Sequence, residues 1–362
     1  MAGHTVAIHF VRSAVRAVER RGIDVRPALA KAGIARSLID YDRARITVEQ
    51  ASAMIRDLWR LTGDEMFGIS PRPLPLGTFR MMALGMIHQP DLAAVLDRCC
   101  EFSRVVPGMP DLRTRLGPGT CRIEADVEKF GCCETIITDT VLFVLHRFAG
   151  WLANSRVRLR LVELPQPEPS YVQDYDLVYD APVRFGAGCA AITIDRDVLP
   201  APIVRDEDDL LRFLGDAPAD LLARREYDSS IVDQVRRILS FGLRGHSPSA
   251  VSSREVAARL SLSLQHVRRL LREEGTSISQ IREDVLRDAA IASLVRGEES
   301  IAALSERLGF SEPSAFRRAF RRWTGGPPGS YRPGGTEGGL ARKTQQRTES
   351  GEVDTDGVEQ AG

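Results

Sequence analysis

The feature that most constrains this chain is a short helix–turn–helix pattern that occurs twice in its last third. The first copy is the run EVAARLSLSLQHVRRLL at residues 255–271. Small Ala257 lets two helices approach closely, and the sharpest point of the turn falls at Ser261, where Gly is commoner. Ser263 is suited to cap the helix that follows. The pattern therefore predicts two short helices that are held at a fixed angle.

The second copy begins with the short helix expected at residues 301–308, where Ser305 stands in place of the small Ala of the first copy. Gly309 marks its turn, which is about one residue longer. Ser311 is expected to cap the next helix, and Pro313 suits the first turn of that helix. A pattern that occurs twice argues against an ordinary amphipathic helix pair, which a single copy would leave open.

The second helix of each copy is expected to bury one face and to present a polar face. The inner positions are Val267, Leu270, Leu271, Phe316 and Phe320. The residues that we expect to bind DNA on this ground are Ser263, Gln265, His266, Arg268, Arg269, Arg272, Arg317, Arg318 and Arg321. A polar, Arg-rich helix face fits the hydrogen-bonding edges of the major groove.

One continuous helix is predicted between the two copies, over residues 279–296. At 1.5 Å per residue it spans about 27 Å. Successive major-groove segments lie roughly 34 Å apart along B-form DNA, so one chain can reach two of them. Residues 248–332 carry fourteen Arg and ten acidic residues, while the whole chain has a formal net charge of zero. Positive charge is thus concentrated in the region that carries the repeated pattern.

The first 200 residues are predicted to form one mixed domain of helices and strands. Helices are expected within residues 1–70, with a start at Thr47, and over 77–88, 91–106 and 134–153. Strands are expected at 112–116, 120–127, 156–164, 177–179 and 190–194, separated by Gly- and Pro-rich turns. The segment around His9 is expected to be a solvated N-terminus.

No uninterrupted apolar run approaches the roughly 18 residues of a membrane helix, and His and Arg residues interrupt the first segment, which excludes a signal peptide. We therefore expect a cytoplasmic protein without a membrane partner. The six cysteines contain no CxxC pair and no zinc spacing, so no metal is expected. No nucleophile–base set or phosphate loop supports an enzyme, and no cofactor is expected.

Residues 252–332 resemble the DNA-binding domain of AraC-type regulators, on the segments RRLLREEGTSISQI, LGFSEPSAFRRAFRRWTG and PPGSYR. The resemblance implies DNA contacts from Gln265, Arg268, Arg269, Ser314, Ala315 and Arg318. More weakly, the first 200 residues resemble the arabinose-binding-like sensor domain of some of these regulators. Residues 75–106 and the segment FGAGCAAITIDRDVLPAPI carry that likeness, which implies effector sensing and dimerisation.

Together these features predict an α+β N-terminal sensor domain followed by an all-α domain with two helix-turn-helix units. The expected divisions are a sensing and dimerisation domain at 1–205, a helical connector at 206–250, the DNA-binding domain at 251–332 and a disordered tail at 333–362. The resemblance implies a transcription factor that binds promoter DNA under the control of a small-molecule effector, with RNA polymerase and a second copy of the chain as further partners.

Two alternatives stay open for the first 200 residues. This region can serve only to dimerise or to bind a protein partner, without any small molecule. It can also sense thiol oxidation through the adjacent pairs Cys99-Cys100 and Cys132-Cys133, although free cysteines usually act as small buried hydrophobes.

Overall fold

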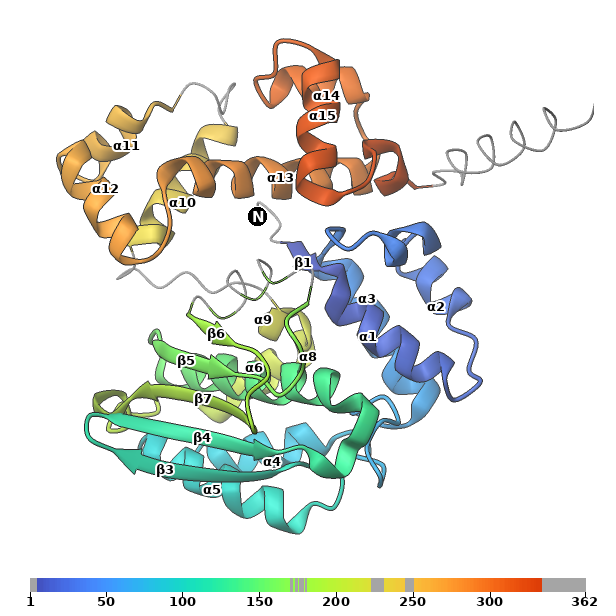
Figure 1. The fold of residues 1–362 in the computed structure, drawn as a ribbon, viewed down its shortest axis with the longest axis vertical. Helices are drawn as coiled ribbons and strands as arrows, with labels where there is room; N and C mark the ends of the chain where they lie inside the picture. Colours follow the sequence, from blue (N-terminus) through green and yellow to red (C-terminus); the bar gives the residue numbers. More distant parts are fainter. Residues whose placement is uncertain are drawn as a thin grey trace, which may run out of the picture.

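The computed structural model describes residues 5–169, 172, 175, 179, 181–222, 231–244 and 251–333, without the side chains of residues 132–135 and 242–244. An N-terminal part (residues 5–222) contains all the strands of this description. A C-terminal part (residues 231–333) is helical throughout (Figure 1). The predicted fold class, α+β followed by all-α, is confirmed.

A five-stranded sheet forms the base of the N-terminal part. Its strands are β3 (Asp111–Gly117), β4 (Thr120–Asp126), β5 (Leu159–Glu163), β6 (Val183–Arg184) and β7 (Ala190–Asp195). They lie in the order β3-β4-β7-β5-β6, and every neighbouring pair is antiparallel except β5 and β6. Every second residue of β4 is buried, as in a sheet with one covered face. Four of the five predicted strands are thus confirmed.

The fifth predicted strand, at 177–179, falls mostly on residues 177 and 178, which lie outside the described residues. Tyr179, its described member, is helical. Strand β6 was not predicted, because its two residues are too few to produce an alternating pattern.

Helices α5 (Leu92–Val105) and α6 (Glu134–Ala153) pack against the sheet, and α4 (Thr78–Met86) packs on α5. All three match the predicted helices. The segment Ile136–Ala153 of α6 is long and apolar enough to cross a membrane by composition alone, but 61% of it is buried inside the protein. Its apolar character is therefore that of a core helix.

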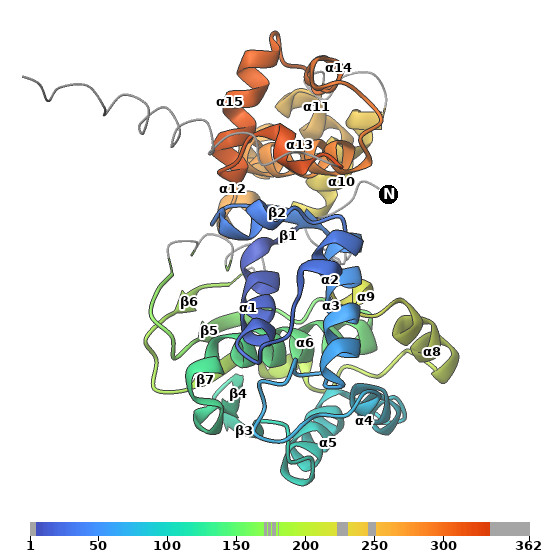
Figure 2. The ribbon, with the colours of Figure 1, turned by 90° about the vertical axis from the view of Figure 1, so that its right-hand side faces the viewer.

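Residues 5–62 form a helical layer above the sheet (Figure 2). They contain α1 (Ile8–Glu19), α2 (Arg26–Lys31), a 3-10 helix (Arg36–Asp40) and α3 (Val48–Thr62), with the short antiparallel strands β1 (Thr5–Ala7) and β2 (Arg45–Thr47). The predicted start at Thr47 is confirmed by a capping box. The backbone N–H of Gln50 donates to Thr47 Oγ1 at 3.2 Å, and the N–H of Thr47 donates to Gln50 Oε1 at 3.1 Å.

The prediction that His9 is solvated is wrong. His9 is only 1% exposed, and its ring stacks on Tyr175 with 5.4 Å between the ring centres. The two short strands explain the difference. Strand β1 pairs with β2 and draws the start of α1 into the interior, a long-range pairing that three-residue strands do not reveal in sequence.

The C-terminal part begins at α10 (Ile231–Arg244). It continues through α11 (Ser253–Arg259), α12 (Leu264–Glu273), α13 (Ile278–Arg296), α14 (Ile301–Arg307), α15 (Pro313–Thr324) and a 3-10 helix (Pro328–Tyr331). Helix α13 runs through its centre, with α11 and α12 at one end and α14 and α15 at the other (Figure 1). The single spacer helix predicted at 279–296 is confirmed.

The segment predicted as a connector, residues 206–250, divides between two apolar cores. Helices α8 (Glu207–Asp216) and α9 (Ala219–Leu222) pack in the core of the N-terminal part through Leu210, Phe213 and Leu221. Helix α10 instead packs on α11, α12 and α13. The C-terminal part therefore includes α10 in addition to the two helix-turn-helix units and the spacer helix α13.

A further apolar cluster joins the two parts. It includes Val15 of α1, Ile46 of β2 and Leu58 of α3 together with Phe316 and Phe320 of α15. The second helix-turn-helix unit is thus packed, through a continuous chain of buried contacts, onto the helical layer of the N-terminal part (Figure 2). The predicted tail at 333–362 lies outside the described residues from 334 onward.

Candidate functional site

The first helix-turn-helix unit consists of α11 and α12. Ser261 adopts a left-handed backbone conformation, with φ at +55°, which confirms the predicted turn at a position where Gly would be less strained. Ser263 caps α12, because its Oγ accepts the backbone N–H of His266 at 3.2 Å. The local sequence therefore fixes the angle at which α12 leaves the turn.

The second unit consists of α14 and α15. Gly309 supplies its positive φ of +81°, and five residues separate the two helices where four separate α11 from α12. The longer turn is as predicted, and Pro313 lies in the first turn of α15. The prediction that Ser311 caps α15 is wrong: the capping position is Glu312, and it makes no side-chain capping bond. The extra turn residue moves the helix start one position along the chain.

Both second helices bury the predicted apolar face. Val267 and Leu271 of α12, and Phe316 and Phe320 of α15, are fully buried, and Leu270 is partly buried. The predicted polar positions are all exposed: Ser263, Gln265, His266, Arg268, Arg269, Arg272, Ser314, Arg317, Arg318 and Arg321. Each helix thus carries a solvent-facing, Arg-rich face opposite its buried one.

The exposed arginines differ in whether they already form an ion pair within the protein. Arg269 forms an ion pair with Glu273 one turn along α12, with 2.6 Å between Nη1 and Oε1. Five others form no ion pair with any residue that the structure describes: Arg268, Arg272, Arg317, Arg318 and Arg321. Guanidinium groups without an internal partner can donate paired hydrogen bonds to guanine or to phosphate oxygens.

Helix α13 sets the distance between the two units. Its 19 residues correspond to about 28 Å of helix axis, close to one turn of B-form DNA. The two units lie at opposite ends of α13, with α14 and α15 on the side away from the sheet (Figure 1). This arrangement suits two contacts with one duplex.

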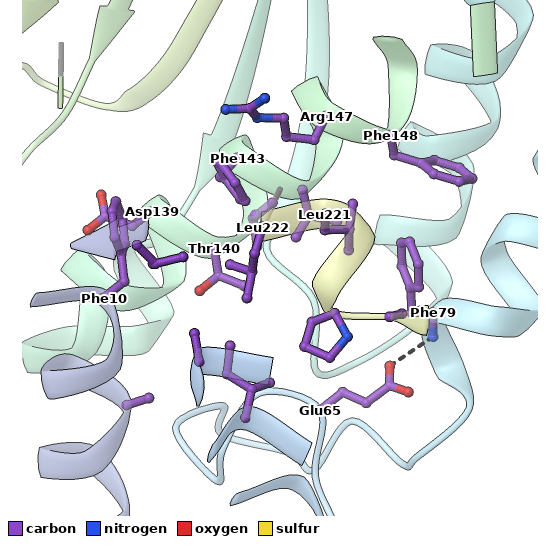
Figure 3. A pocket seen from close by; sticks show the side chains of 18 of the residues that line it. Phe10, Glu65, Phe79, Asp139, Thr140, Phe143, Arg147, Phe148, Leu221 and Leu222 are labelled. Atoms are coloured by element: carbon purple, nitrogen blue, oxygen red, sulfur yellow. Dashed lines mark hydrogen bonds between the residues drawn. The ribbon is translucent and has the colours of Figure 1, made fainter. Parts of the chain in front are cut away.

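The second functional feature is a cavity of about 590 Å³ that is lined mostly by residues of the N-terminal part. Helices α1, α3, α4, α6 and α9 contribute to its wall. Phe10 lies at one side of it, Phe79 and Phe148 lie at the other, and Leu221 and Leu222 lie between (Figure 3). A largely apolar space of this size is typical of a small-molecule site.

Asp139 of α6 is an ionisable group in this largely apolar wall. It is 3% exposed, and it accepts a hydrogen bond of 2.9 Å from the hydroxyl of Tyr175. Burial raises the pKa of Asp139 to about 7, although the hydrogen bonds from Tyr175 and Gln166 oppose the shift. The protonation state of this carboxyl therefore changes near neutral pH.

Glu65 lies at the opposite side of the cavity, next to the N-terminal end of α4. Its carboxylate accepts the backbone N–H groups of Gly77 at 2.6 Å and of Phe79 at 2.8 Å (Figure 3). Burial raises the pKa of Glu65, and these two hydrogen bonds lower it. Glu65 thus holds the beginning of α4, including Phe79, in place against the cavity.

The sequence analysis did not identify the cavity residues. The cavity wall comes from segments far apart in the chain, so no local pattern marks it. One signal was present: Asp139 is the only charged residue of α6 between Glu134 and His146. A carboxyl at such a position must be paired, protonated or functional.

The buried cysteines do not favour a thiol sensor. Cys99 and Cys100 are buried, and burial raises the pKa of both, that of Cys99 to about 12. A buried thiol with a raised pKa holds little of the reactive thiolate. Cys99 instead contacts Met86, with 3.6 Å between the sulfur atoms, as a core side chain does. The side chains of Cys132 and Cys133 lie outside the described residues.

Two family models match this chain. The arabinose-binding domain of AraC transcription regulators, an N-terminal domain, matches residues 22–203. A helix-turn-helix domain matches residues 256–334. The first match alone covers half of the chain, and the two together include most of the N-terminal part and nearly all of both helix-turn-helix units.

Several named proteins are similar to this chain. The ornithine utilization regulator of Pseudomonas aeruginosa is 21% identical over 330 residues, which cover 90% of this chain and 96% of the relative. The regulator VqsM of the same species is 40% identical over 78 residues, 22% of this chain and 23% of its own length. The crystal structure of the regulator CdpR, also from P. aeruginosa, aligns with a TM-score of 0.28 at 21% identity, covering 71% of this chain and 82% of that one. On the family models, this chain belongs to the AraC-type transcriptional regulators, DNA-binding proteins with an arabinose-binding-like N-terminal domain and no enzymatic role.

Proposed function

We propose that this regulator binds two successive major-groove segments of a promoter with α12 and α15, and that a small molecule in the N-terminal cavity controls this binding. The observation that carries the proposal is the exposed, Arg-rich face on each second helix, at opposite ends of α13. Helix α13, which lies between them, is about 28 Å long, nearly one turn of the duplex.

Within α12 and α15, we assign base reading to Gln265, Arg268, Arg269 and Arg318. Guanidinium and amide groups can form paired hydrogen bonds with guanine and adenine edges. The remaining exposed positions, Ser263, His266, Arg272, Ser314, Arg317 and Arg321, suit phosphate contacts, which orient the protein without reading sequence. Arg269 must leave Glu273 to contact DNA, so its contribution to affinity is smaller than that of Arg268.

For the N-terminal part, the cavity favours effector binding over a role limited to dimerisation. A pure dimerisation domain has no need of a 590 Å³ apolar space with a buried carboxyl such as Asp139 in its wall. Filling that space recovers dispersion contacts that its lining side chains lack. We place this regulator in the cytoplasm, where promoter DNA, RNA polymerase and a second copy of the chain are its further partners.

These assignments also bear on the domain division. We propose residues 1–205 as the sensing domain, extended by α8 and α9, whose apolar side chains complete its core. We propose α10 together with residues 251–332 as the DNA-binding unit, because α10 shares a core with α11, α12 and α13.

The test is selection of genomic fragments by the purified full-length protein at physiological salt, with and without pooled metabolites. We expect enrichment of one motif with two half-sites about one helical turn apart. Binding that lacks a motif and disappears with added salt would contradict sequence-specific recognition, because it reflects phosphate contacts alone.

A matched pair of variants controls this selection. Arg268→Ala should relax the preference at one position of the motif, whereas Arg259→Ala, on the exposed side of α11 and paired with Glu255, should leave the motif unchanged. An unchanged motif with both variants would mean that α12 does not read bases.

A further inference from the structure

The cavity of the N-terminal part is also bounded by the DNA-binding helices. Its lining includes Arg236 of α10 and Asp284, Arg287 and Asp288 of α13, beside Thr5 and Arg45 of the β1–β2 pair. A molecule that fills the cavity therefore touches the same helix that carries both helix-turn-helix units.

These residues form one buried hydrogen-bonded cluster. Thr5 Oγ1 donates to Asp288 Oδ1 at 2.6 Å and accepts from Arg45 Nε at 2.8 Å. Arg287 Nε lies 3.3 Å from the same Asp288 oxygen. Burial alone would raise the pKa of Asp288, but the charges of Arg287 and Arg45 and the Thr5 hydrogen bond hold it below its usual value. Asp288 is thus an ionised group shared by the two parts of the chain.

The cluster continues along α13 to α10. Arg287 Nη1 lies 3.0 Å from Asp284 Oδ1, and Arg236 Nη2 lies 3.5 Å from Asp284 Oδ2. The side chains of these three residues are between 6% and 12% exposed. Ionic interactions are strongest in such a water-poor setting, where solvent screens them least.

The charges of the wall favour an anion. At the end of the cavity next to α13, the described lining contains three arginines and two aspartates: Arg45, Arg236, Arg287, Asp284 and Asp288. Over the whole described lining, five arginines face four acidic side chains. The rest of the wall is predominantly apolar, so the complementary ligand joins one negative group to an apolar body.

We infer that the effector site spans both parts of the chain and takes an amphipathic carboxylate, with the apolar body among the aromatic side chains of the cavity and the carboxylate at Arg45 and Arg287 beside α13. This inference rests on the proposed effector function and specifies its ligand class. Because the carboxylate competes with Asp288 and Asp284 for the same guanidinium groups, it changes the contacts that join the β1–β2 pair to α13. DNA affinity and ligand affinity are then thermodynamically linked.

Three probes of equal chain length test the ligand class on the full-length protein: decanoate, decanol and decylamine. Trp59 lines the cavity, so its fluorescence reports binding, with calorimetry as a second readout. We expect decanoate to bind at least about tenfold more tightly than decanol or decylamine, a difference that one charge-assisted contact can supply. Equal affinities, a preference for the amine or no binding of any probe would overturn the inference.

Two variants of α13 locate the carboxylate. Arg287→Gln should weaken decanoate binding about tenfold, with little change for decanol, whereas Arg296→Gln, at the exposed end of the same helix, should preserve the preference for the acid. If Arg287→Gln does not fold, Arg45→Gln tests the same contact from the other side. Loss of the preference in Arg147→Gln but not in the Arg287 variant would place the carboxylate on α6 and overturn the shared site.

Motif selection by the ligand-free protein distinguishes a failure of this inference from a failure of the proposed DNA-binding function. A regulator that selects a motif but shows no preference for decanoate would retain the proposed function and lose this inference. A regulator that binds decanoate through Arg287 but selects no motif would lose the DNA-binding proposal instead.

Discussion

Thr5, in the first strand, donates a hydrogen bond of 2.6 Å to Asp288 in the middle of α13, 283 residues further along the chain. Both residues are buried, and Asp288 is the acidic group that the two parts share. The helix that carries both DNA-binding units is therefore joined directly to the start of the effector-sensing part. Any change in that junction can alter the position of α13.

The first prediction concerns this junction. Thr5→Val keeps the shape of the side chain but removes the donor, which leaves a buried carboxylate with one hydrogen bond fewer. We expect the free energy of unfolding to fall by about 1–3 kcal/mol, as measured by urea denaturation. Thr193→Val, on the distant strand β7, is the matched control and should change stability by less. Equal effects of the two substitutions would show that the Thr5 bond contributes nothing specific.

The second prediction concerns the first recognition helix. Arg268→Ala and Arg269→Ala should each weaken binding to the selected motif by about 1–3 kcal/mol, as measured by fluorescence anisotropy at fixed salt. The loss of affinity should be larger for Arg268→Ala, because Arg269 must break its ion pair with Glu273 before it can contact DNA. Full affinity in both variants would refute the assignment of α12 as a reading helix.

The third prediction concerns the second recognition helix. If α15 reads bases as α12 does, Arg318→Ala should weaken binding to the selected motif by a similar free energy. It should also relax specificity in the second half-site. Arg307→Ala, on α14 and paired with Glu299, serves as the control on the same unit. A uniform loss across all sequences, together with a smaller salt dependence, would instead assign Arg318 to a phosphate.

The fourth prediction concerns pH and Asp139. Its pKa is raised from 3.8 to about 7 in the folded protein, so between these values the carboxyl ionises only in the unfolded state. Stability is therefore lost as the pH rises from 3.8 to about 7. Asp139→Asn, which stays neutral, should flatten this decline by roughly 1 kcal/mol per pH unit. Parallel unfolding curves for the two proteins across this range would contradict the assignment.

The fifth prediction concerns the small residue of each helix-turn-helix unit. Ser305 is fully buried, and its hydroxyl has no hydrogen-bond partner among the described residues, whereas the first unit has buried Ala257 in the corresponding place. Ser305→Ala should raise the free energy of unfolding by about 1 kcal/mol, since it removes an unsatisfied polar group. The reverse change, Ala257→Ser, should lower it. Destabilisation by Ser305→Ala would mean that the hydroxyl has a partner in solution.

Local sequence determined the parts of this protein in which a few neighbouring residues decide the conformation. Ser263 as a cap, Gly309 at positive φ and the spacing of Phe316 and Phe320 were sufficient to predict both helix-turn-helix units. Their exposed arginines followed from the same helical periodicity, because a helix that buries one face must expose the other.

Tertiary structure decided everything that depends on residues brought together from distant segments. The pairing of β1 with β2 is too short to appear in sequence, yet it buries His9 and places Thr5 against Asp288. Helix α10 joined the DNA-binding core rather than remaining a connector, because its apolar face found partners on α11, α12 and α13. The cavity and its shared wall exist only where these long-range contacts leave space, and such contacts are set by the packing of the whole chain rather than by any local pattern.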